Sequence, residues 1–302
     1  MTTAELLHTL RDRLTPSLGG FAQSDAEAII LESLNISKTQ LYTDFSIDVN
    51  ENDLIRINAV FERRMKGEPL QYILGKAYFY DREFLVNPDV LIPRPDTETL
   101  IETIINTEND APAKFIDIGT GSGIIPVILT AHRPSWKAVA VDISYNALRT
   151  AALNINDISN ISNNNNYIYN TNNNNVTNQN KPSDIILICC DMLSAVKPQK
   201  QFDFIVSNPP YISAPQMKTL DKNVVNYEPR TALYGGEDGL DYYRIISSSA
   251  KNYLKEGGHI YVEIGYDQGD SVPKIFKNNG WSGITVIKDL GGRNRVVTAV
   301  GF

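Results

Sequence analysis

The chain has 302 residues, of which 42% are hydrophobic, and carries a formal net charge of −7. This length and composition are typical of one or two globular domains with a sizeable core. The negative charge argues against broad binding to nucleic acid, which depends on basic contacts to phosphate. The three histidines and the adjacent pair Cys189 and Cys190 form no cluster of ligands, so we expect core cysteines and neither a metal ion nor a disulfide framework. Without a membrane-length apolar run or a secretion signal, a soluble cytoplasmic protein is expected.

Residues 1–72 are predicted to form a small helical domain. Leu6, Leu7, Leu10 and Leu14 recur at the spacing of one helix face, and two further segments before residue 66 repeat this period. Acidic and basic side chains are interspersed along these segments, which is typical of a solvated outer face.

Residues 73–95 differ in character from the helical region. Aromatic and β-branched residues surround turn-forming residues here, which predicts a β-hairpin that links two domains. Pro93 and Pro95 end this extended pattern, and Asp96 is expected to cap the helix that follows.

Residues 96–302 are predicted to form an α/β domain, because short apolar strands alternate with helical segments. The expected strands are 114–118, 138–142, 185–190, 202–206, 259–264, 284–287 and 296–300. Near-continuous apolar strands separated by helices indicate a mostly parallel sheet covered on both faces. The last two strands are too close in sequence for a helical crossover, so they should form an antiparallel hairpin at the end of the sheet.

Residues 154–181 interrupt this pattern with an asparagine-rich insertion. Between Asn154 and Asn180, fourteen of the twenty-seven residues are asparagine. Such a segment has too few apolar groups to offset the entropy lost on ordering. We therefore predict a mobile surface loop that carries no chemistry.

A glycine-rich turn follows the first expected strand. It consists of Gly119, Thr120, Gly121, Ser122 and Gly123. Glycine allows a sharp turn and a close approach to a ligand, and the helix that follows begins with free N–H groups. A dinucleotide-binding turn needs a further glycine at position 124, which is isoleucine here. The spacing therefore disfavours NAD and favours S-adenosylmethionine as the cofactor.

Two aspartates at strand ends extend this cofactor site. Asp142 ends the second expected strand, where its carboxylate can accept hydrogen bonds from both ribose hydroxyls. Asp191 ends the third, where an adenine ring would lie, and Met192 is its apolar neighbour. Either aspartate could instead be an ordinary strand-end residue.

The fourth expected strand leads into Asn208, Pro209, Pro210 and Tyr211. Asn-Pro and Pro-Pro are also turn dipeptides, so a purely structural turn is the alternative. The side-chain oxygen of Asn208 and the carbonyl of Pro209 can each accept one N–H of a planar amide or amine, and proline adds no competing donor. Tyr211 can pack its ring on the planar substrate group. These residue types favour methylation of a nitrogen whose lone pair is otherwise delocalised.

Taken with its other motifs, the chain resembles the release factor glutamine methyltransferase (PrmC/HemK) family from the helical region to the C-terminus. Besides the two loops above, the resemblance is carried by Gly67-Glu68-Pro69-Leu70-Gln71-Tyr72, Pro93-Arg94-Pro95-Asp96-Thr97-Glu98, Tyr227-Glu228-Pro229-Arg230-Thr231-Ala232-Leu233, Gly236-Glu237-Asp238-Gly239-Leu240, Glu263-Ile264-Gly265 and Asp289-Leu290-Gly291-Gly292-Arg293-Asn294-Arg295.

The resemblance implies a class I S-adenosylmethionine-dependent methyltransferase fold. It implies a Rossmann-like, seven-stranded sheet in residues 96–302, with a substrate-recognition role for the helical domain. The expected reaction is methylation of the glutamine side-chain nitrogen in the Gly-Gly-Gln motif of peptide chain release factors, with S-adenosyl-L-homocysteine as the other product. A monomer without direct contact to nucleic acid or membrane is expected.

Carried over by motif, Gly119 to Gly123, Asp142 and Asn208 would contact the cofactor, and Asn208 to Tyr211 the glutamine. Met192 stands where the family often has tryptophan, which leaves an aromatic contact to adenine open there. Arg94 and Glu98 could shape the substrate cleft or form a structural salt bridge. The alternative function is an adenine-N6 DNA or RNA methyltransferase, because a flipped adenine presents a similar planar amino group.

Overall fold

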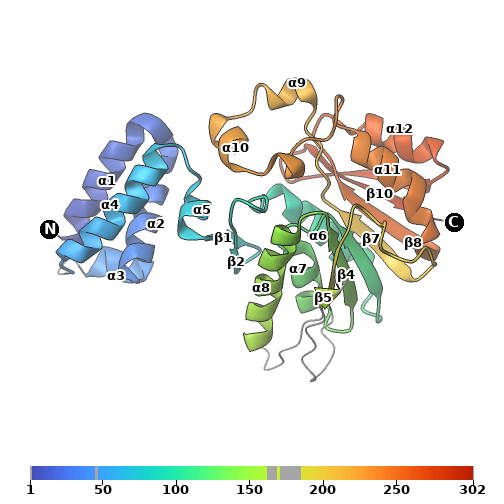
Figure 1. Cartoon of the computed structure of the whole chain (residues 1–302), viewed down its shortest axis with the longest axis horizontal. Helices are drawn as coiled ribbons and strands as arrows, with labels where there is room; N and C mark the ends of the chain where they lie inside the picture. Colours follow the sequence, from blue (N-terminus) through green and yellow to red (C-terminus); the bar gives the residue numbers. More distant parts are fainter. Residues whose placement is uncertain (1, 45–46, 162–168, 171–184, 302) are drawn as a thin grey trace. The chain divides into compact units, whose positions relative to one another are not determined.

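The computed structural model describes residues 2–44, 47–161, 169–170 and 185–301 (Figure 1). The chain divides into two compact units. The helical unit comprises Met1–Gly75 together with Lys222–Tyr227, and the sheet unit comprises Lys76–Asp221 and Glu228–Phe302. No helix in the described part of the chain is long and apolar enough to cross a membrane.

The helical unit packs short helices around leucine and isoleucine side chains such as Leu10, Leu14 and Ile29, which are almost fully buried. Its helices are α1 (Thr3–Leu18), η1 (Gly19–Phe21), α2 (Ala22–Leu34), α3 (Lys38–Thr43), α4 (Glu51–Met65), α5 (Leu70–Leu74) and α10 (Lys222–Tyr227). A half-buried ion pair of 2.6 Å between Arg64 Nε and the Asp25 carboxylate ties α4 to α2. The helical character predicted for the N-terminal region is confirmed.

Helix α10 is the part of this unit that the sequence did not predict. It comes from far along the chain, yet Tyr227 donates a hydrogen bond of 3.3 Å to the carbonyl of Lys66 at the end of α4. Gly67, next in the chain, has φ +91°, and a side chain there would collide with Asn223. The turn after α4 therefore needs glycine both for its backbone conformation and for its close contact with α10.

The sheet unit begins with the expected hairpin, formed by β1 (Lys76–Phe79) and β2 (Arg82–Leu85). Only Tyr80 and Asp81 lie between the strands, and both have positive φ, at 52° and 60°. A two-residue turn with two left-handed residues matches the natural twist of a hairpin. Phe79 and Phe84 bury one face of the hairpin in the core of this unit.

Among the described residues, the main sheet has 8 strands in the order β5-β6-β4-β3-β7-β8-β10-β9. Its strands are β3 (Lys114–Ile118), β4 (Lys137–Asp142), β5 (Tyr169–Asn170), β6 (Ile185–Cys189), β7 (Phe202–Ser207), β8 (Leu254–Glu263), β9 (Ser282–Lys288) and β10 (Asn294–Val300). Neighbours from β5 to β8 are parallel, whereas β10 is antiparallel to both β8 and β9. All seven predicted strands are present, including the closing hairpin, and β5 is an eighth.

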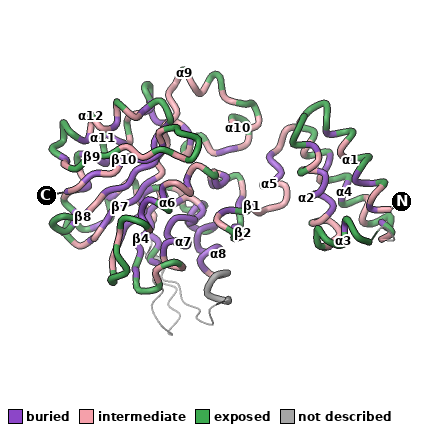
Figure 2. The backbone as a smooth tube through the Cα atoms, turned by 180° about the vertical axis from the view of Figure 1, so that it is seen from behind, coloured by how far each residue is buried: buried purple, intermediate pink, exposed green. Residues whose placement is uncertain are grey.

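Helices cover both faces of this sheet, as the apolar strands predicted. The helices of the sheet unit are α6 (Asp96–Thr107), α7 (Ile124–His132), α8 (Tyr145–Ile161), α9 (Ala214–Met217), η2 (Arg230–Ala232), α11 (Asp241–Ser249), η3 (Ala250–Asn252) and α12 (Ser271–Asn278). One core joins α6, α7 and α8 to one face, and a second core joins α11 and α12 to the other. Figure 2 shows the central strands as the most continuously buried part of the unit.

The surface loop predicted for the asparagine-rich segment does not begin at Asn154. Asn154 was expected in a surface loop but lies within α8 and is 3% exposed. Its side chain accepts from Leu85 N at 2.7 Å and donates to the carbonyls of Leu85 at 3.0 Å and Ser122 at 2.8 Å. Asn154 is therefore a buried clamp between the hairpin and the glycine-rich turn. Most of the predicted loop, at 162–168 and 171–181, lies outside the described residues.

Asp96 is not the helix cap that the sequence predicted. Helix α6 begins at Asp96 itself, after Pro95, and no side chain caps it. The Asp96 carboxylate instead pairs with the Arg295 guanidinium at 2.9 Å. This ion pair joins the start of α6 to β10. The negative charge of Asp96 in the first turn also interacts favourably with the helix dipole.

Asn154→Ala is predicted to destabilise the sheet unit by about 2–3 kcal/mol. The change removes three hydrogen bonds and leaves buried backbone groups without partners. Urea unfolding of both proteins measures the difference. Asn156→Ala on the same helix is the control, because Asn156 is only partly buried and its side chain donates to the Ala152 carbonyl of its own helix. Equal unfolding midpoints for the two variants would contradict this stabilising role of Asn154.

Candidate active site

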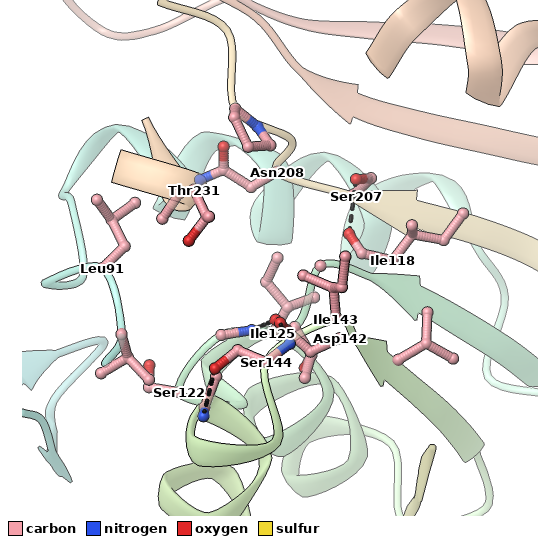
Figure 3. Close-up of a pocket in the computed structure, with 18 of the residues that line it drawn as sticks. Leu91, Ile118, Ser122, Ile125, Asp142, Ile143, Ser144, Ser207, Asn208 and Thr231 are labelled. Carbon is pink, nitrogen blue, oxygen red and sulfur yellow. Dashed lines mark hydrogen bonds between the residues drawn. The ribbon is translucent and has the colours of Figure 1, made fainter. Parts of the chain in front are cut away.

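A cavity opens at the carboxyl ends of the strands in the sheet unit (Figure 3). The chain passes from β3 outward to β4 and β6 on one side, and then returns to β7 and β8 on the other side of β3. The connections therefore diverge between β3 and β7, and ligands bind at such a switch point in open α/β sheets. The glycine-rich turn follows β3, and the Asn-Pro-Pro-Tyr loop follows β7.

The glycine-rich turn forms one wall of the cavity. Gly119, Gly121 and Gly123 have φ values of 76°, 56° and 80°, which other residues adopt only with strain. A Cβ atom at Gly119 or Gly121 would meet no atom within 4 Å, so both positions face open space. At Gly123 it would lie 3.1 Å from the Ala151 Cβ of α8, so this glycine permits close packing.

Beneath the turn lies a buried acid. Asp117 is 0% exposed, and neither its two carboxyl oxygens nor the Thr120 hydroxyl has a regular hydrogen-bond partner in the described part of the chain. Burial raises the pKa of Asp117 to about 7, although the nearby Thr120 hydroxyl lowers it. A buried carboxyl with unused acceptors is the kind of group that receives a cationic ligand group.

Asp142 ends β4 at the cavity, where it was predicted. One carboxylate oxygen accepts from Gly121 N at 2.9 Å and the other from Ser144 N at 2.8 Å. Burial raises its pKa, and these backbone N–H groups oppose that shift. A carboxylate has about four acceptor positions, so two remain for a diol. Asp142 thus fixes the glycine-rich turn and still faces the cavity.

The wall formed by the ends of β4 and β6 combines acidic and apolar groups. Asp191 and Met192 line it as expected, together with Ile143 and Tyr242. The pKa of Tyr242 is raised, mainly by burial and then by the charge of Asp191. An aromatic ring from α11 is therefore present near Met192, in a place where the sequence left an aromatic contact open.

Asn208 lies across the cavity from Ser122, Asp142 and Ser144 (Figure 3). Its amide nitrogen donates to the Thr97 hydroxyl at 3.1 Å. Just before it, the Ser207 hydroxyl donates to the Ile118 carbonyl at 2.7 Å and holds β7 to β3. Because its nitrogen is engaged, Asn208 presents its side-chain oxygen as an acceptor.

The Asn-Pro-Pro-Tyr loop is held from behind by the segment around residues 233–239. Ile212 N donates to the Leu233 carbonyl and Gly235 N donates to the Ile212 carbonyl, both at 2.9 Å. A Cβ at Gly235 would lie 2.6 Å from the Pro210 carbonyl oxygen. The glycines of this segment therefore let a second backbone pack directly against the loop.

Gln268 completes this support. Its side-chain nitrogen donates to the carbonyls of Tyr211 at 3.1 Å and Gly239 at 3.0 Å, and its oxygen accepts from the Tyr243 hydroxyl at 3.2 Å. Gln268 was not singled out from the sequence, because its role depends on three segments that meet only in the fold.

Most of the predicted site residues meet around this cavity. Those that line it are Gly119, Thr120, Gly121, Ser122, Asp142, Asp191, Met192, Asn208 and Pro210. Gly123, Pro209 and Tyr211 lie outside the lining, and the ring of Tyr211 packs against the core shared with α11 and α12. Burial raises the pKa of Tyr211, which keeps it neutral.

The cavity also has walls that the sequence did not predict. They include Val90, Leu91, Thr97 and Thr231, together with Cys190, which is half-buried and packs against the second core as well. Arg94 lines the cavity and pairs with the buried Glu228 carboxylate at 2.5 Å, whereas Glu98 is not part of the lining. Within the described residues, no group of three or more His, Cys, Asp or Glu side chains could hold a metal ion.

Separate groups of the site match separate parts of S-adenosylmethionine. The open space over Gly119 and Gly121 accommodates a ligand against the backbone, and the first turn of α7 has no side-chain cap and can receive a carboxylate. Asp142, which lines the cavity, suits ribose hydroxyls, and Asp117 lies buried just before the turn, outside the lining. The fold and this cavity define a class I S-adenosylmethionine-dependent methyltransferase.

Comparison with known proteins narrows this class to a family. Residues 5–75 match the family described as "PrmC N-terminal domain", and residues 96–209 match a "Methyltransferase domain". The release factor glutamine methyltransferase of Koribacter versatilis is 36% identical over 90% of this chain and 89% of its own length. The same-named enzyme of Francisella tularensis is 35% identical over 96% of this chain and 97% of its own. The chain belongs to the release factor glutamine methyltransferase family.

Solved structures agree on the fold. A methyltransferase from Pyrococcus furiosus superimposes with a TM-score of 0.50 and 14% identity, covering 80% of this chain and 98% of its own. At this identity the likeness concerns the fold alone.

Gly235→Ala is predicted to lower methyl transfer by at least about tenfold while cofactor affinity stays within a factor of about two. The added methyl group collides with the Pro210 carbonyl oxygen and displaces the Asn-Pro-Pro-Tyr loop, and displacements near 1 Å can cost about 100-fold in rate. Turnover assays and calorimetric titration with S-adenosyl-L-homocysteine measure the two effects. Gly20→Ala is the control, because a Cβ there meets nothing within 4 Å.

Proposed function

We propose that this protein methylates the side-chain amide nitrogen of the glutamine in the Gly-Gly-Gln motif of peptide chain release factors. Membership of the release factor glutamine methyltransferase family supports the substrate class. The observation that carries the proposal is Asn208, which lines the cavity with its nitrogen bound to Thr97 and its oxygen free for a substrate N–H.

Asn208 and Pro209 are proposed to orient the glutamine amide. The Asn208 side-chain oxygen accepts one N–H and the Pro209 carbonyl accepts the other. Two acceptors set in this way turn the nitrogen lone pair toward the methyl group and stabilise positive charge as it develops. Positioning of this kind can supply up to about 7–11 kcal/mol. When bound, S-adenosylmethionine supplies an electrophilic methyl group, so no side chain has to act as a nucleophile.

The cofactor roles are assigned from the geometry of the walls. We assign Gly119 to Gly123 to the methionine part and Asp142 to the ribose hydroxyls. Asp191 and Met192 are assigned to the adenine, and Tyr242 adds an aromatic ring to this wall. Pro210 borders the substrate side, whereas Tyr211 is assigned to anchoring the loop, because its ring packs on the core.

The alternative, adenine-N6 methylation of nucleic acid, is less well supported. The cavity lining carries the acids Asp89, Asp142 and Asp191, and its only charged base among the described residues, Arg94, is paired with Glu228. Such a wall repels phosphate. Labelled S-adenosylmethionine offered in parallel to a release factor, DNA and RNA decides between the two. Label in nucleic acid alone would refute the proposal.

The helical unit is proposed to recognise the body of the release factor, because the catalytic loop reads only one side chain. Its match to the PrmC N-terminal domain supports this role. We further propose a monomer that acts in the cytoplasm, without direct contact to nucleic acid.

Asn208→Ala is predicted to lower kcat by about 100- to 1,000-fold, the effect of removing one group that stabilises developing charge. Binding of S-adenosyl-L-homocysteine should remain measurable by calorimetry. The control is Asn279→Ala, because Asn279 does not line the cavity. Near-normal turnover of the Asn208 variant would refute the assigned role.

Asp142→Ala is predicted to weaken cofactor binding by about 10- to 100-fold, because a charged acceptor shared by the turn and the ribose is lost. Titration calorimetry gives the dissociation constants. Asp203→Ala is a matched control, since Asp203 lies near the start of β7 and accepts from Lys114 N and Lys255. If both variants bind equally well, Asp142 does not hold the ribose.

A further inference from the structure

Glu263 is a buried acid directly beside the catalytic loop. It is the last residue of β8 and is 1% exposed. In the parallel pairing of β7 with β8, Ser207 lies opposite Val262. The next residues along the two strands are Asn208 and Glu263, so the register of the sheet sets these two side by side.

No salt bridge compensates the burial of Glu263 within the described residues. The guanidinium of Arg295 lies near, but its nitrogens pair with the carboxylates of Asp96 and Asp289, both at 2.9 Å. Neither carboxyl oxygen of Glu263 has a partner of regular hydrogen-bond geometry. An acid kept in such a position is costly for stability and calls for a functional explanation.

Thr97 connects Glu263 to Asn208. The Thr97 side chain is 1% exposed, and its oxygen accepts the Asn208 amide N–H at 3.1 Å. A hydroxyl has one hydrogen to donate, and once it accepts from Asn208 that hydrogen needs an acceptor of its own. The Glu263 carboxyl is near enough for Thr97 and Asn208 to lower its pKa, so it is the candidate acceptor.

We propose that Glu263 is a positioning residue whose carboxylate, directly and through the Thr97 hydroxyl, accepts from the Asn208 amide nitrogen and so turns the Asn208 oxygen toward the substrate. This inference rests on the proposed function of Asn208 as an acceptor for the glutamine N–H. A protonated Glu263 has a hydrogen to donate, which favours the opposite orientation of the Asn208 amide and presents its NH₂ group to the substrate.

The pKa of Glu263 makes this orientation sensitive to pH. Burial, and to a smaller extent the charge of Asp96, raise the pKa of Glu263, whereas Thr97, Arg295 and Asn208 lower it, and the net result is a pKa of about 7. The other ionisable neighbours, Tyr211 and Tyr243, have raised pKa values and remain neutral near pH 7. The working carboxylate form is therefore lost as the pH falls through about 7, and activity should fall with it.

The direct test follows the side-chain NH₂ signals of Asn208 by ¹⁵N NMR between pH 6 and pH 9, assigned from their absence in Asn208→Asp. In the wild type they should shift with an apparent pKa near 7. In Glu263→Gln the shift with pH should disappear. Glu108→Gln is the matched control, because Glu108 bonds His259 and Tyr261 of the same strand and does not line the cavity.

The kinetic test compares kcat and KM for a release factor over the same pH range. Glu263→Gln should lower kcat by about 10- to 100-fold, as the loss of residues that orient metal ligands does in metal sites, and remove the acidic limb of the profile. KM for S-adenosylmethionine should change less than twofold. Thr97→Val preserves the shape of the side chain and should also lower kcat. It replaces Glu263→Gln as the test if that variant does not fold.

Asn208 signals that respond neither to pH nor to Glu263→Gln would overturn the inference, whether or not a release factor is methylated. Signals that do respond, in a protein that methylates no release factor, would support the positioning of Asn208 and count against the proposed function alone. A kcat profile that keeps its acidic limb in Glu263→Gln would also overturn the inference.

Discussion

The parallel pairing of β7 with β3 and β8 is the constraint on which the site depends. Ile118 lies opposite Ser207, and Ser207 lies opposite Val262. The residues that follow these three are Gly119, Asn208 and Glu263, so a cofactor turn, an acceptor amide and a buried acid emerge in one row at the edge of the sheet. A one-residue slip of any strand would turn its side chains to the other face. The hydrophobic pattern that fixes the register therefore also fixes the chemistry.

Near that row, the protein buries acidic side chains whose burial lowers its stability. Asp117 and Glu263 lie at the ends of central strands, almost without access to solvent, and the pKa of each is raised to about 7. Replacing such acids by apolar residues is often neutral or stabilising in other proteins. Asp117 lies just before the cofactor turn, and Glu263, as proposed above, orients an amide.

The sequence was sufficient for the parts of the fold that depend on local pattern. Apolar strands, glycine spacing and the Asn-Pro-Pro-Tyr loop predicted the sheet and most of the cavity wall, because each signal lies within a few neighbouring residues. Asn154 was assigned to a surface loop, since composition cannot reveal which asparagine of a polar run is buried. Tyr242 and Gln268 carry no local signal, and Thr97 belongs to a family motif that gave it no role, so the places of all three become clear only when distant segments meet.

Helix α10 has a consequence for how the protein is divided. The chain leaves the catalytic loop, enters the helical unit at Lys222 and leaves it after Tyr227, and Glu228 then pairs with Arg94 at the cavity wall. The helical unit is thus assembled from two separate stretches of chain. A fragment cut after Gly75 lacks one of its helices, and a fragment that starts at Lys76 carries that helix without the surface it packs on. A domain exchange that moves the helical unit of this protein therefore has to transfer both stretches together.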